Sequence, residues 1–340
     1  MNDLNPGHIL QTATAFFPAK VLLSATELDL FTKLSEKPMN GVELCNSLGL
    51  HPRANPDFFD TLVALNFLLR DGNGSDATYQ NTPETAAFLN KSSPAYIGGF
   101  LEMANARLYH SWGDLTEALR TGKAQNELKN SDKPLFDAIY DDPARLEQFI
   151  DAMTGIQIGN IMALAEKFDF SGYKTLCDVG GSGATLARAI ALGHPNIICI
   201  SADLPAVTAI AKKRIADSGL SDRIEAIDLD FFRDCFPKVD IITMGNILHD
   251  WNLDVKKMLI TKAFEALPSG GAFIAIENII DDERRENAFG LLMSLNMLVE
   301  TGDGFDYTGA DFDGWCKEVG FSRTEILPLA GPTSAAIAYK

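Results

Sequence analysis

The chain has 340 residues, of which 46% are hydrophobic and 22% are charged, and its formal net charge at pH 7 is −17. This composition is typical of a folded globular protein without a long disordered tract, and the length predicts two domains. The acidic balance disfavours binding to nucleic acid or to an anionic membrane, because both of those surfaces repel negative charge.

The cysteines are scattered without a C-x-x-C pair, mostly in apolar runs, and are Cys45, Cys177, Cys199, Cys235 and Cys316. This pattern predicts reduced thiols in a cytoplasmic protein. No basic segment precedes a long apolar stretch at the N-terminus, and no window holds 18 uncharged apolar residues, so we expect neither secretion nor membrane spanning. No pair of histidines has zinc-ligand spacing, with or without a cysteine, which predicts no metal site.

Residues 1–92 are predicted to form a helical, winged-helix-like dimerisation domain. Their apolar residues recur at helical spacing. One helix is expected to begin at Asn40 as its cap, and a later one at Asn55, with Pro56 in its first turn. The segment ATYQNTPETAAFL that follows is typical of a small β wing, and helix, turn, helix and wing together predict a winged-helix module.

Winged-helix modules often bind DNA, and a winged-helix regulator is one alternative for this chain. Residues 30–90, however, hold only four basic residues against seven acidic ones. Phosphate contacts need clustered basic side chains, so we expect this domain to form a homodimer interface instead.

Residues 93–340 are predicted to form a helical connector followed by an α/β domain. The polar segment NELKNSDKPLF is the most linker-like part, because its proline interrupts a helix. From residue 173 onward, β-branched apolar runs alternate with helical stretches, which predicts a Rossmann-like, doubly wound and mostly parallel sheet. The last two runs, RTEILPLA and SAAIAYK, are expected to pair as an antiparallel hairpin.

The stretch CDVGGSGATLA places Asp178 at a strand end and three glycines before a helix. Glycines let the backbone turn tightly and approach a ligand, and the helix N-terminus that follows favours an anion. A tight turn between packed elements would explain the same pattern. The fingerprint G-x-G-x-x-G is not met, which disfavours an NAD-dependent oxidoreductase.

Acidic residues follow the next two predicted strands, at Asp203 and Asp230. Ligands of open parallel sheets bind over the carboxyl ends of the strands, so these two acids are expected to face one crevice. A carboxylate after the second strand suits a ribose, because it can accept hydrogen bonds from two neighbouring hydroxyls.

The motifs DVGG, DLP and LHDW occur in this order, and an acidic residue ends the fifth strand. Together they resemble the S-adenosylmethionine-dependent O-methyltransferases of the caffeic acid, hydroxyindole and bacterial polyketide or phenazine type, over nearly the whole chain. The resemblance implies a class I methyltransferase sheet behind a dimerisation domain, S-adenosylmethionine as cofactor and a small aromatic hydroxylated substrate.

The resemblance also implies a set of cofactor contacts. The glycine turn would lie against the methionine part, Asp203 would bind the ribose, and Asp230 and Phe231 would hold the adenine. The expected cofactor-binding residues are Asp178, Gly180, Gly181, Asp203, Leu204, Asp230, Phe231, Gly245, Asn246 and Asp250.

Two positions depart from the family pattern. In the turn, Ser182 and Ala184 stand where relatives have glycine, so we expect the local loop geometry to differ from that of the relatives. Four residues before the histidine of LHDW, Gly245 replaces a common Lys or Arg and removes a cationic contact to the cofactor.

His249, in LHDW, is the predicted general base that removes the proton of the acceptor hydroxyl. The resemblance places Glu277 and Asp306 on either side of it, where a carboxylate would raise its basicity and fix its tautomer. Position alone favours the alternative of a surface or capping histidine at a helix start, with Asp250 as an acid of the first helical turn.

The apolar segment LLMSLNMLVE carries Met293 and Met297 four residues apart on one helix face, where methionines also serve as core filler. The resemblance implies that this helix lines the acceptor pocket together with the helix of Met153 and Gln157, with Phe149 behind them. Thioether and aromatic walls suit a flat aromatic acceptor.

The sequence therefore predicts transfer of a methyl group from S-adenosylmethionine to a hydroxyl, most simply a phenolic one. The main alternative is a protein that binds S-adenosylmethionine but performs other chemistry on a small aromatic metabolite. The presence of His249, Glu277 and Asp306 speaks against that alternative.

Overall fold

The computed structural model describes residues 4–131 and 139–340. The chain divides into two compact units, Met1–Tyr109 and His110–Lys340. The predicted boundary, after residue 92, lies earlier in the chain than this division. The first unit extends further because helix α7 (Gly98–Met103) packs against α2 (Phe16–Glu27). The predicted linker, residues 126–136, lies partly outside the described residues. Within the described ranges, no helix is long and apolar enough to cross a bilayer.

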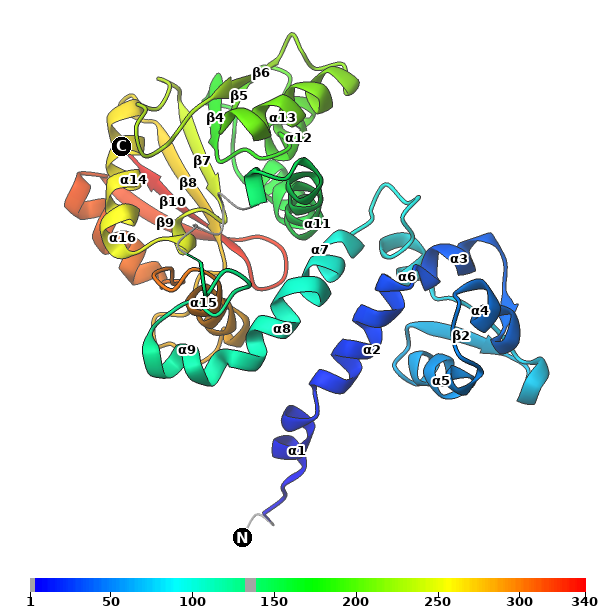
Figure 1. The fold of residues 1–340 in the computed structure, drawn as a ribbon. Coiled ribbons are helices and arrows are strands. Elements are labelled where there is room, and N and C mark those ends of the chain that lie inside the picture. The colour runs from blue at the N-terminus through cyan, green and yellow to red at the C-terminus, as the bar shows by residue number, and fades with distance from the viewer. Residues whose placement is uncertain (1–3, 132–138) are drawn as a thin grey trace. The chain divides into compact units, whose positions relative to one another are not determined.

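The N-terminal unit is mostly helical (Figure 1). It contains one small antiparallel sheet in the order β1-β3-β2. The wing is the pair β2 and β3, in which Leu68 lies opposite Asn81, and it follows helices α4 and α5, which confirms the predicted winged-helix fold. Besides α2 and α7, the elements are α1 (Gly7–Ala13), α3 (Leu30–Glu36), β1 (Met39–Asn40), α4 (Gly41–Ser47), η1 (Pro52–Ala54), α5 (Asp57–Ala64), β2 (Leu68–Asp71), η2 (Gly74–Asp76), β3 (Thr78–Asn81), α6 (Pro83–Phe88) and η3 (Ala104–Leu108).

Of the two predicted helix caps in this unit, one is confirmed and one is wrong. The Asn40 side chain accepts hydrogen bonds from the backbone N–H groups of Val42 and Glu43, and the Glu43 carboxylate accepts one from the N–H of Asn40. Asn55, in contrast, ends the 3₁₀ helix η1, and Pro56 takes the cap position of α5 without a side-chain acceptor.

The C-terminal unit is built on a seven-stranded sheet in the order β6-β5-β4-β7-β8-β10-β9 (Figure 1). Strands β4 to β8 are parallel, and β10 pairs antiparallel with both β8 and β9. Every predicted strand is present, including the terminal hairpin. The strands are β4 (Thr175–Val179), β5 (Ile198–Asp203), β6 (Ile224–Asp228), β7 (Ile241–Gly245), β8 (Ala272–Glu277), β9 (Arg323–Pro328) and β10 (Ser334–Tyr339).

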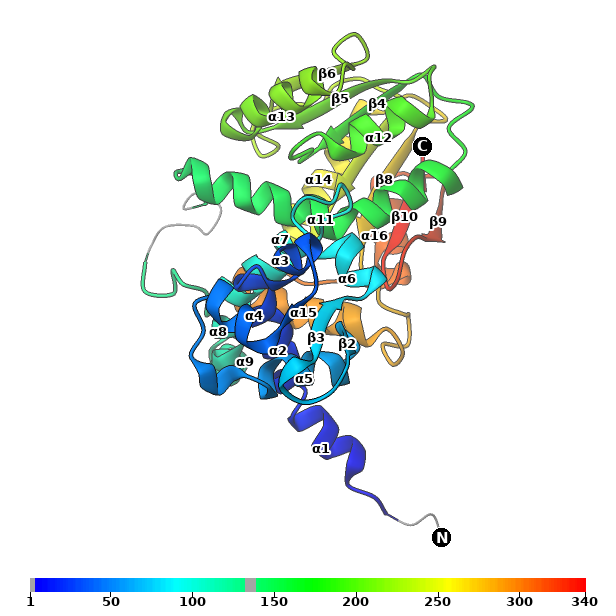
Figure 2. The same ribbon diagram turned by 90° about the vertical axis from the view of Figure 1, so that its right-hand side faces the viewer.

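Helices cover both faces of this sheet, as expected for strands that are buried on both sides. Ile241 of β7 belongs to an apolar core shared with α11, α12 and α13, whereas its neighbour Ile242 belongs to a second core shared with α14 and α16. The long helix α11 is seen side-on in Figure 2. The helices are α8 (Tyr109–Ser111), η4 (Trp112–Asp114), α9 (Leu115–Thr121), α11 (Pro143–Lys167), α12 (Thr185–Gly193), α13 (Pro205–Asp217), η5 (Leu248–Asp250), α14 (Leu253–Ala266), α15 (Ala288–Glu300) and α16 (Gly309–Val319).

The turn after β4 keeps a left-handed backbone at the two positions where glycine is replaced. Ser182 has φ 50° and Ala184 has φ 58°, and Gly180 also has a positive φ of 74°. A side chain in the left-handed region costs roughly 1–2 kcal/mol. Ser182 and Ala184 therefore keep the left-handed backbone that glycine adopts easily, and this conformation is strained for both residues.

Replacing Ser182 with glycine is expected to raise the free energy of unfolding by about 1 kcal/mol. The change relieves the left-handed strain and removes a buried hydroxyl that has no hydrogen-bond partner. Chemical denaturation of the cofactor-free protein measures the effect. Ala184→Gly is the matched control: it relieves the same strain but loses a fully buried methyl group worth about 0.8 kcal/mol, so its gain should be smaller. A larger gain for Ala184→Gly would contradict the explanation.

Candidate active site

A pocket lies at the carboxyl ends of β4, β5 and β7, with α11 along one wall. Among its lining residues are eight of the ten predicted for the cofactor: Asp178, Gly180, Gly181, Asp203, Phe231, Gly245, Asn246 and Asp250. Leu204 and Asp230 adjoin this region in sequence but are not part of the lining. From the predicted acceptor site, Phe149, Met153 and Gln157 of α11 line the pocket, whereas Met293 and Met297 of α15 do not.

Asp203 is the acid at the end of β5, and backbone groups fix its orientation. Its Oδ2 accepts a hydrogen bond from the N–H of Ser182 at 2.9 Å, and its Oδ1 accepts one from the N–H of Leu204 at 2.7 Å. Burial raises the pKa of Asp203 to about 6, although both hydrogen bonds oppose the rise. Each oxygen retains a lone pair for a ligand hydroxyl.

The glycine turn has no room for side chains at its first two positions. A Cβ on Gly180 would lie 2.4 Å from Ile247, and one on Gly181 would lie 2.3 Å from the Ser201 hydroxyl. Below the turn, Asp178 is buried and accepts a hydrogen bond from the Thr243 hydroxyl at 2.7 Å. Burial raises the pKa of Asp178 to about 7.

At Gly245, where the resemblance leads us to expect a cation, the nearest side chain is a neighbouring amide. A Cβ placed on Gly245 would lie 3.6 Å from Nε2 of Gln157 on α11. The amide can donate a hydrogen bond into the pocket but carries no charge. Asn246, the next residue, has a left-handed backbone with φ 52°.

Glu277 holds the LHDW turn in place from the neighbouring strand. Strands β7 and β8 are in parallel register, with Gly245 opposite Ile276, so Glu277 at the end of β8 lies beside the chain that leaves β7. Its Oε1 accepts hydrogen bonds from the N–H groups of Leu248 at 3.0 Å and His249 at 3.4 Å. The second oxygen, Oε2, is thereby turned toward the imidazole.

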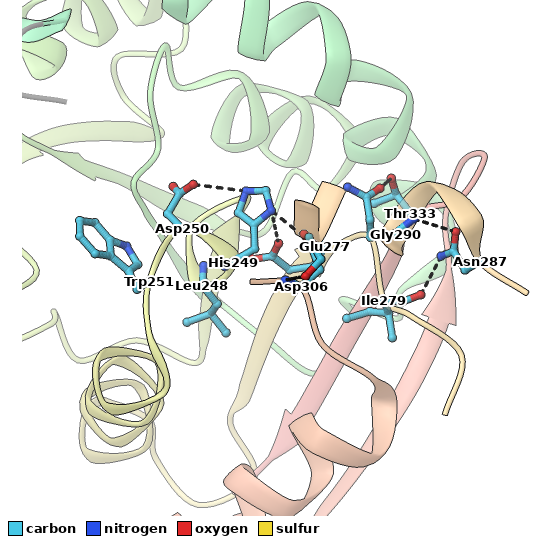
Figure 3. A network of polar contacts seen from close by, with 12 residues as sticks. Leu248, His249, Asp250, Trp251, Glu277, Ile279, Asn287, Gly290, Asp306 and Thr333 are labelled. Carbon is cyan, nitrogen blue, oxygen red and sulfur yellow. Dashed lines mark hydrogen bonds and ion pairs between the residues drawn. The ribbon is translucent and has the colours of Figure 1, made fainter. Parts of the chain in front are cut away.

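Three carboxylates surround the buried imidazole of His249 (Figure 3). Its Nδ1 lies 3.3 Å from Oδ1 of Asp306 and 3.6 Å from Oε2 of Glu277, while its Nε2 lies 3.6 Å from Oδ1 of Asp250. The two predicted partners thus both approach Nδ1. Asp250 lines the pocket and also lies beside Nε2, so it belongs to both parts of the site.

These acids make His249 unusually basic. Burial by itself lowers the pKa of His249, but the negative charges of Glu277, Asp250 and Asp306 outweigh it and raise the pKa to about 10. Burial in turn raises the pKa of Glu277 to about 7 and that of Asp250 to about 6, although the charge of His249 opposes both rises. The site is a network of coupled charges in which His249 is the strongest base.

The same cluster has the dimensions of a metal site. One atom each from His249, Glu277 and Asp306 lies within 4.8 Å of the other two. An imidazolium proton on Nδ1, shared with the two carboxylates, explains the same spacing without an ion. The absence of a metal stays a prediction.

Sequence reasoning missed Lys256, a fully buried residue of α14. Leu259, Ile260 and Ala263 are buried on the same helix, at the i+3, i+4 and i+7 positions from Lys256. A lysine at an apolar position of this periodicity is the signal that could have found it.

Two family matches cover most of the chain. Residues 112–322 match the O-methyltransferase domain, and residues 10–91 match the O-methyltransferase dimerisation domain. The chain belongs to the O-methyltransferase family. It is an S-adenosylmethionine-dependent O-methyltransferase, as the sequence predicts.

Individual relatives span nearly the full length of this O-methyltransferase. The tetracenomycin polyketide synthesis 8-O-methyl transferase TcmO of Streptomyces glaucescens is 37% identical, over 98% of this chain and 97% of the relative. The 3-hydroxy-5-methyl-1-naphthoate 3-O-methyltransferase of Streptomyces sahachiroi is 32% identical, over 96% and 92%. The crystal structure of human N-acetylserotonin methyltransferase in complex with S-adenosylmethionine has a TM-score of 0.91 at 27% identity and covers 100% of this chain and 99% of that one.

The residues of the pocket suit this cofactor. The oriented Asp203 carboxylate can receive the ribose hydroxyls, and the backbone of Gly180 and Gly181 lines the same pocket, where the methionine part can lie against it. The strain at Ser182 and Ala184 is unfavourable for the pocket.

Proposed function

We propose that this methyltransferase acts on a hydroxyl of a small aromatic molecule, with His249 as the general base. The observation that carries the proposal is the orientation of the imidazole: Asp306 and Glu277 both face Nδ1, while Nε2 is directed toward the pocket-lining Asp250. The names of the relatives support the acceptor class, since one of them acts on a hydroxynaphthoate.

The bound cofactor supplies an activated methyl group on a positively charged sulfur. The chain has to align the acceptor oxygen with that methyl group and remove the hydroxyl proton. Alignment in such reactions contributes up to roughly 7–11 kcal/mol, and a general base contributes about 10² to 10⁴ in rate. Nε2 of His249 takes the proton, while the carboxylates at Nδ1 stabilise the imidazolium that results.

The basicity of His249 suits a phenol. A phenol has a pKa of about 10, and the carboxylates raise the pKa of His249 to about 10 as well, so the proton transfer is close to balanced. In the free protein His249 is therefore protonated at pH 7. A positive ligand beside Asp250 disfavours the imidazolium and returns the histidine toward its neutral, basic form.

The acceptor site is proposed to lie between α11 and α15. Phe149 and Met153 of α11 line the pocket, and their apolar side chains suit a flat ring. Met297 is buried and Met293 is half-buried on α15. Both are proposed as the opposite wall.

A homodimer in the cytoplasm completes the proposal. The match of residues 10–91 to a dimerisation domain supports a homodimer. Exposed apolar side chains at this end of the chain suit a protein interface, and they are Leu4, Ile9, Leu10, Phe16 and Phe17. The five cysteines are free thiols, which fits a reducing compartment.

Incubation with S-adenosylmethionine and a panel of phenols and hydroxyquinones tests the function by mass spectrometry. A product heavier by one methylene, together with S-adenosylhomocysteine, is the expected result. Tight cofactor binding without any methylated product would favour the alternative, a protein that performs other chemistry on an aromatic metabolite. Binding of NADH in place of S-adenosylmethionine would contradict both.

The value of kcat/KM is expected to rise with pH from about 6 toward 9. The carboxylates raise the pKa of His249 above that of a free histidine, and only its neutral form accepts a proton, so activity is lost as the pH falls. Rates with one acceptor at saturating cofactor measure the profile. Calorimetric titration with S-adenosylmethionine across the same pH range is the control for cofactor binding. A profile that is flat from pH 6 to 9 would contradict the assignment.

A further inference from the structure

Lys256 is a buried cation directly behind the His249 turn. It lies on α14, and its side chain has no exposed surface. Its ammonium donates a hydrogen bond to the carbonyl of Trp251, the residue that follows the turn Leu248–Asp250. An ammonium has three donors and loses its hydration on burial, so a lysine in this position is costly unless nearby charges favour it.

The same ammonium also contacts the loop that carries Asp306. It lies 3.7 Å from the ring centroid of Phe305 and 5.9 Å from that of Tyr307, the residues on either side of Asp306. Cations are attracted to the faces of aromatic rings at these separations. One side chain therefore contacts both segments that position the His249 cluster, the end of the turn and the loop.

The charged groups that face Lys256 come from three further elements. They are Asp250 of η5, Glu277 of β8 and Asp306 of the loop, with His249 among them and the Tyr307 phenol beside them. Among the residues that the structure describes in this cluster, His249 is the one other cation beside the three carboxylates. Lys256 supplies the second positive charge.

We propose that Lys256 is a positioning residue for methyl transfer: its buried charge balances the three carboxylates around His249 and keeps the histidine available as a base. The inference rests on the proposed function of His249. Without Lys256, the carboxylates would bind the imidazolium proton more tightly, and less neutral histidine would be present at pH 7.

The protonation of Lys256 makes this role dependent on pH. Burial lowers the pKa of Lys256 to about 8, although Glu277, Asp306 and Asp250 oppose the change. Its charge is therefore present at pH 7 and lost as the pH rises above about 8. Any contribution of the charge should disappear over the same range.

The test compares Lys256→Met with the wild-type enzyme across pH. Methionine fills a similar apolar volume, but it leaves the three carboxylates with less positive charge beside them, and removing one partner from a set of buried charges is destabilising. We expect a lower melting temperature, a kcat/KM about tenfold lower at pH 7 for the folded variant, and a loss of kcat/KM that shrinks above pH 8. Lys257→Met is the matched control, because the adjacent lysine is more exposed and pairs with Glu318 at 2.6 Å. It should retain wild-type kcat/KM.

Lys256→Arg provides a second variant, because its charge does not titrate in this range. Its rate at pH 7 should exceed that of Lys256→Met, and its profile should lack a step near pH 8. If Lys256→Met fails to fold, the pH profile of kcat/KM for Lys256→Arg decides the question by itself. A step near pH 8 that is retained in Lys256→Arg would overturn the proposal.

A Lys256→Met enzyme with the wild-type profile, or with the same loss at every pH, would also overturn it. His249→Ala in the same assays separates the two proposals. If His249→Ala is inactive and Lys256→Met is normal, only the role of Lys256 fails. If His249→Ala is fully active, the base assignment fails.

Discussion

Replacing His249 with alanine is expected to lower kcat by about 10² to 10⁴ while the dissociation constant of S-adenosylmethionine changes little. The variant lacks the group that accepts the hydroxyl proton, and His249 lies beside the pocket without being part of its lining. Alignment of acceptor and methyl group remains, so some methyl transfer should persist. Fixed-time assays with an identified acceptor measure kcat, and calorimetry with the cofactor measures the dissociation constant.

His51→Ala is the control for this variant. His51 is exposed in the N-terminal unit, where its imidazole accepts a hydrogen bond from the N–H of Arg53. Its removal should leave kcat unchanged. Full activity of His249→Ala on the same acceptor would contradict the assignment of His249 as general base. Alignment of the acceptor with the methyl group would then account for catalysis alone.

Replacing Asp203 with alanine is expected to weaken binding of S-adenosylmethionine by about 100-fold, which corresponds to one or two hydrogen bonds to a charged group. The variant loses the predicted ribose acceptor, and it also frees the N–H groups of Ser182 and Leu204 that shape the turn. Isothermal titration gives the dissociation constant.

The neighbouring strand offers the control, since Asp228 lies opposite Asp203 in the register of β5 and β6 and is exposed. Asp228→Ala removes the same charge at the same level of the sheet without touching the turn. Equal losses of affinity in the two variants would show a general effect of charge and would contradict a ribose contact at Asp203.

Much of the fold could be predicted because its signals are local and repeated. The β-branched runs that alternate with helical stretches identify each strand of the large sheet, and their order places Asp178 and Asp203 at the same edge. Asn40 was predictable as a cap because Glu43 completes a capping box three residues later. Asn55 was not, since the adjacent Pro56 takes the cap position and sequence does not show where a short 3₁₀ turn ends.

The candidate site could be predicted only in part, because its chemistry depends on contacts between distant segments. The motif order and the family resemblance predicted His249, Glu277 and Asp306 as site residues, and the structure places the three side chains together, but the position of Asp250 beside Nε2 follows from the turn that Glu277 holds. The backbone of Ser182 and Ala184 is likewise set by the surrounding packing, which overrides their preference against positive φ.

Lys256 was hidden for a related reason. On a helical wheel it occupies a buried position, yet a lysine there is usually read as a solvent-exposed residue with a long apolar stem. The Lys256 side chain is covered by the loop of Phe305 and Tyr307, which follows about 50 residues later in the sequence.

In the proposed mechanism, His249 removes the proton of the acceptor hydroxyl. Single-turnover rates of methyl transfer, measured at pH 7 for phenols with pKa from about 7 to about 10, test it most directly. We expect similar rates across the series for the wild-type enzyme. For His249→Ala we expect rates that fall steeply as the phenol pKa rises, because only acidic phenols ionise without a base. The same dependence on phenol pKa in both enzymes would contradict it.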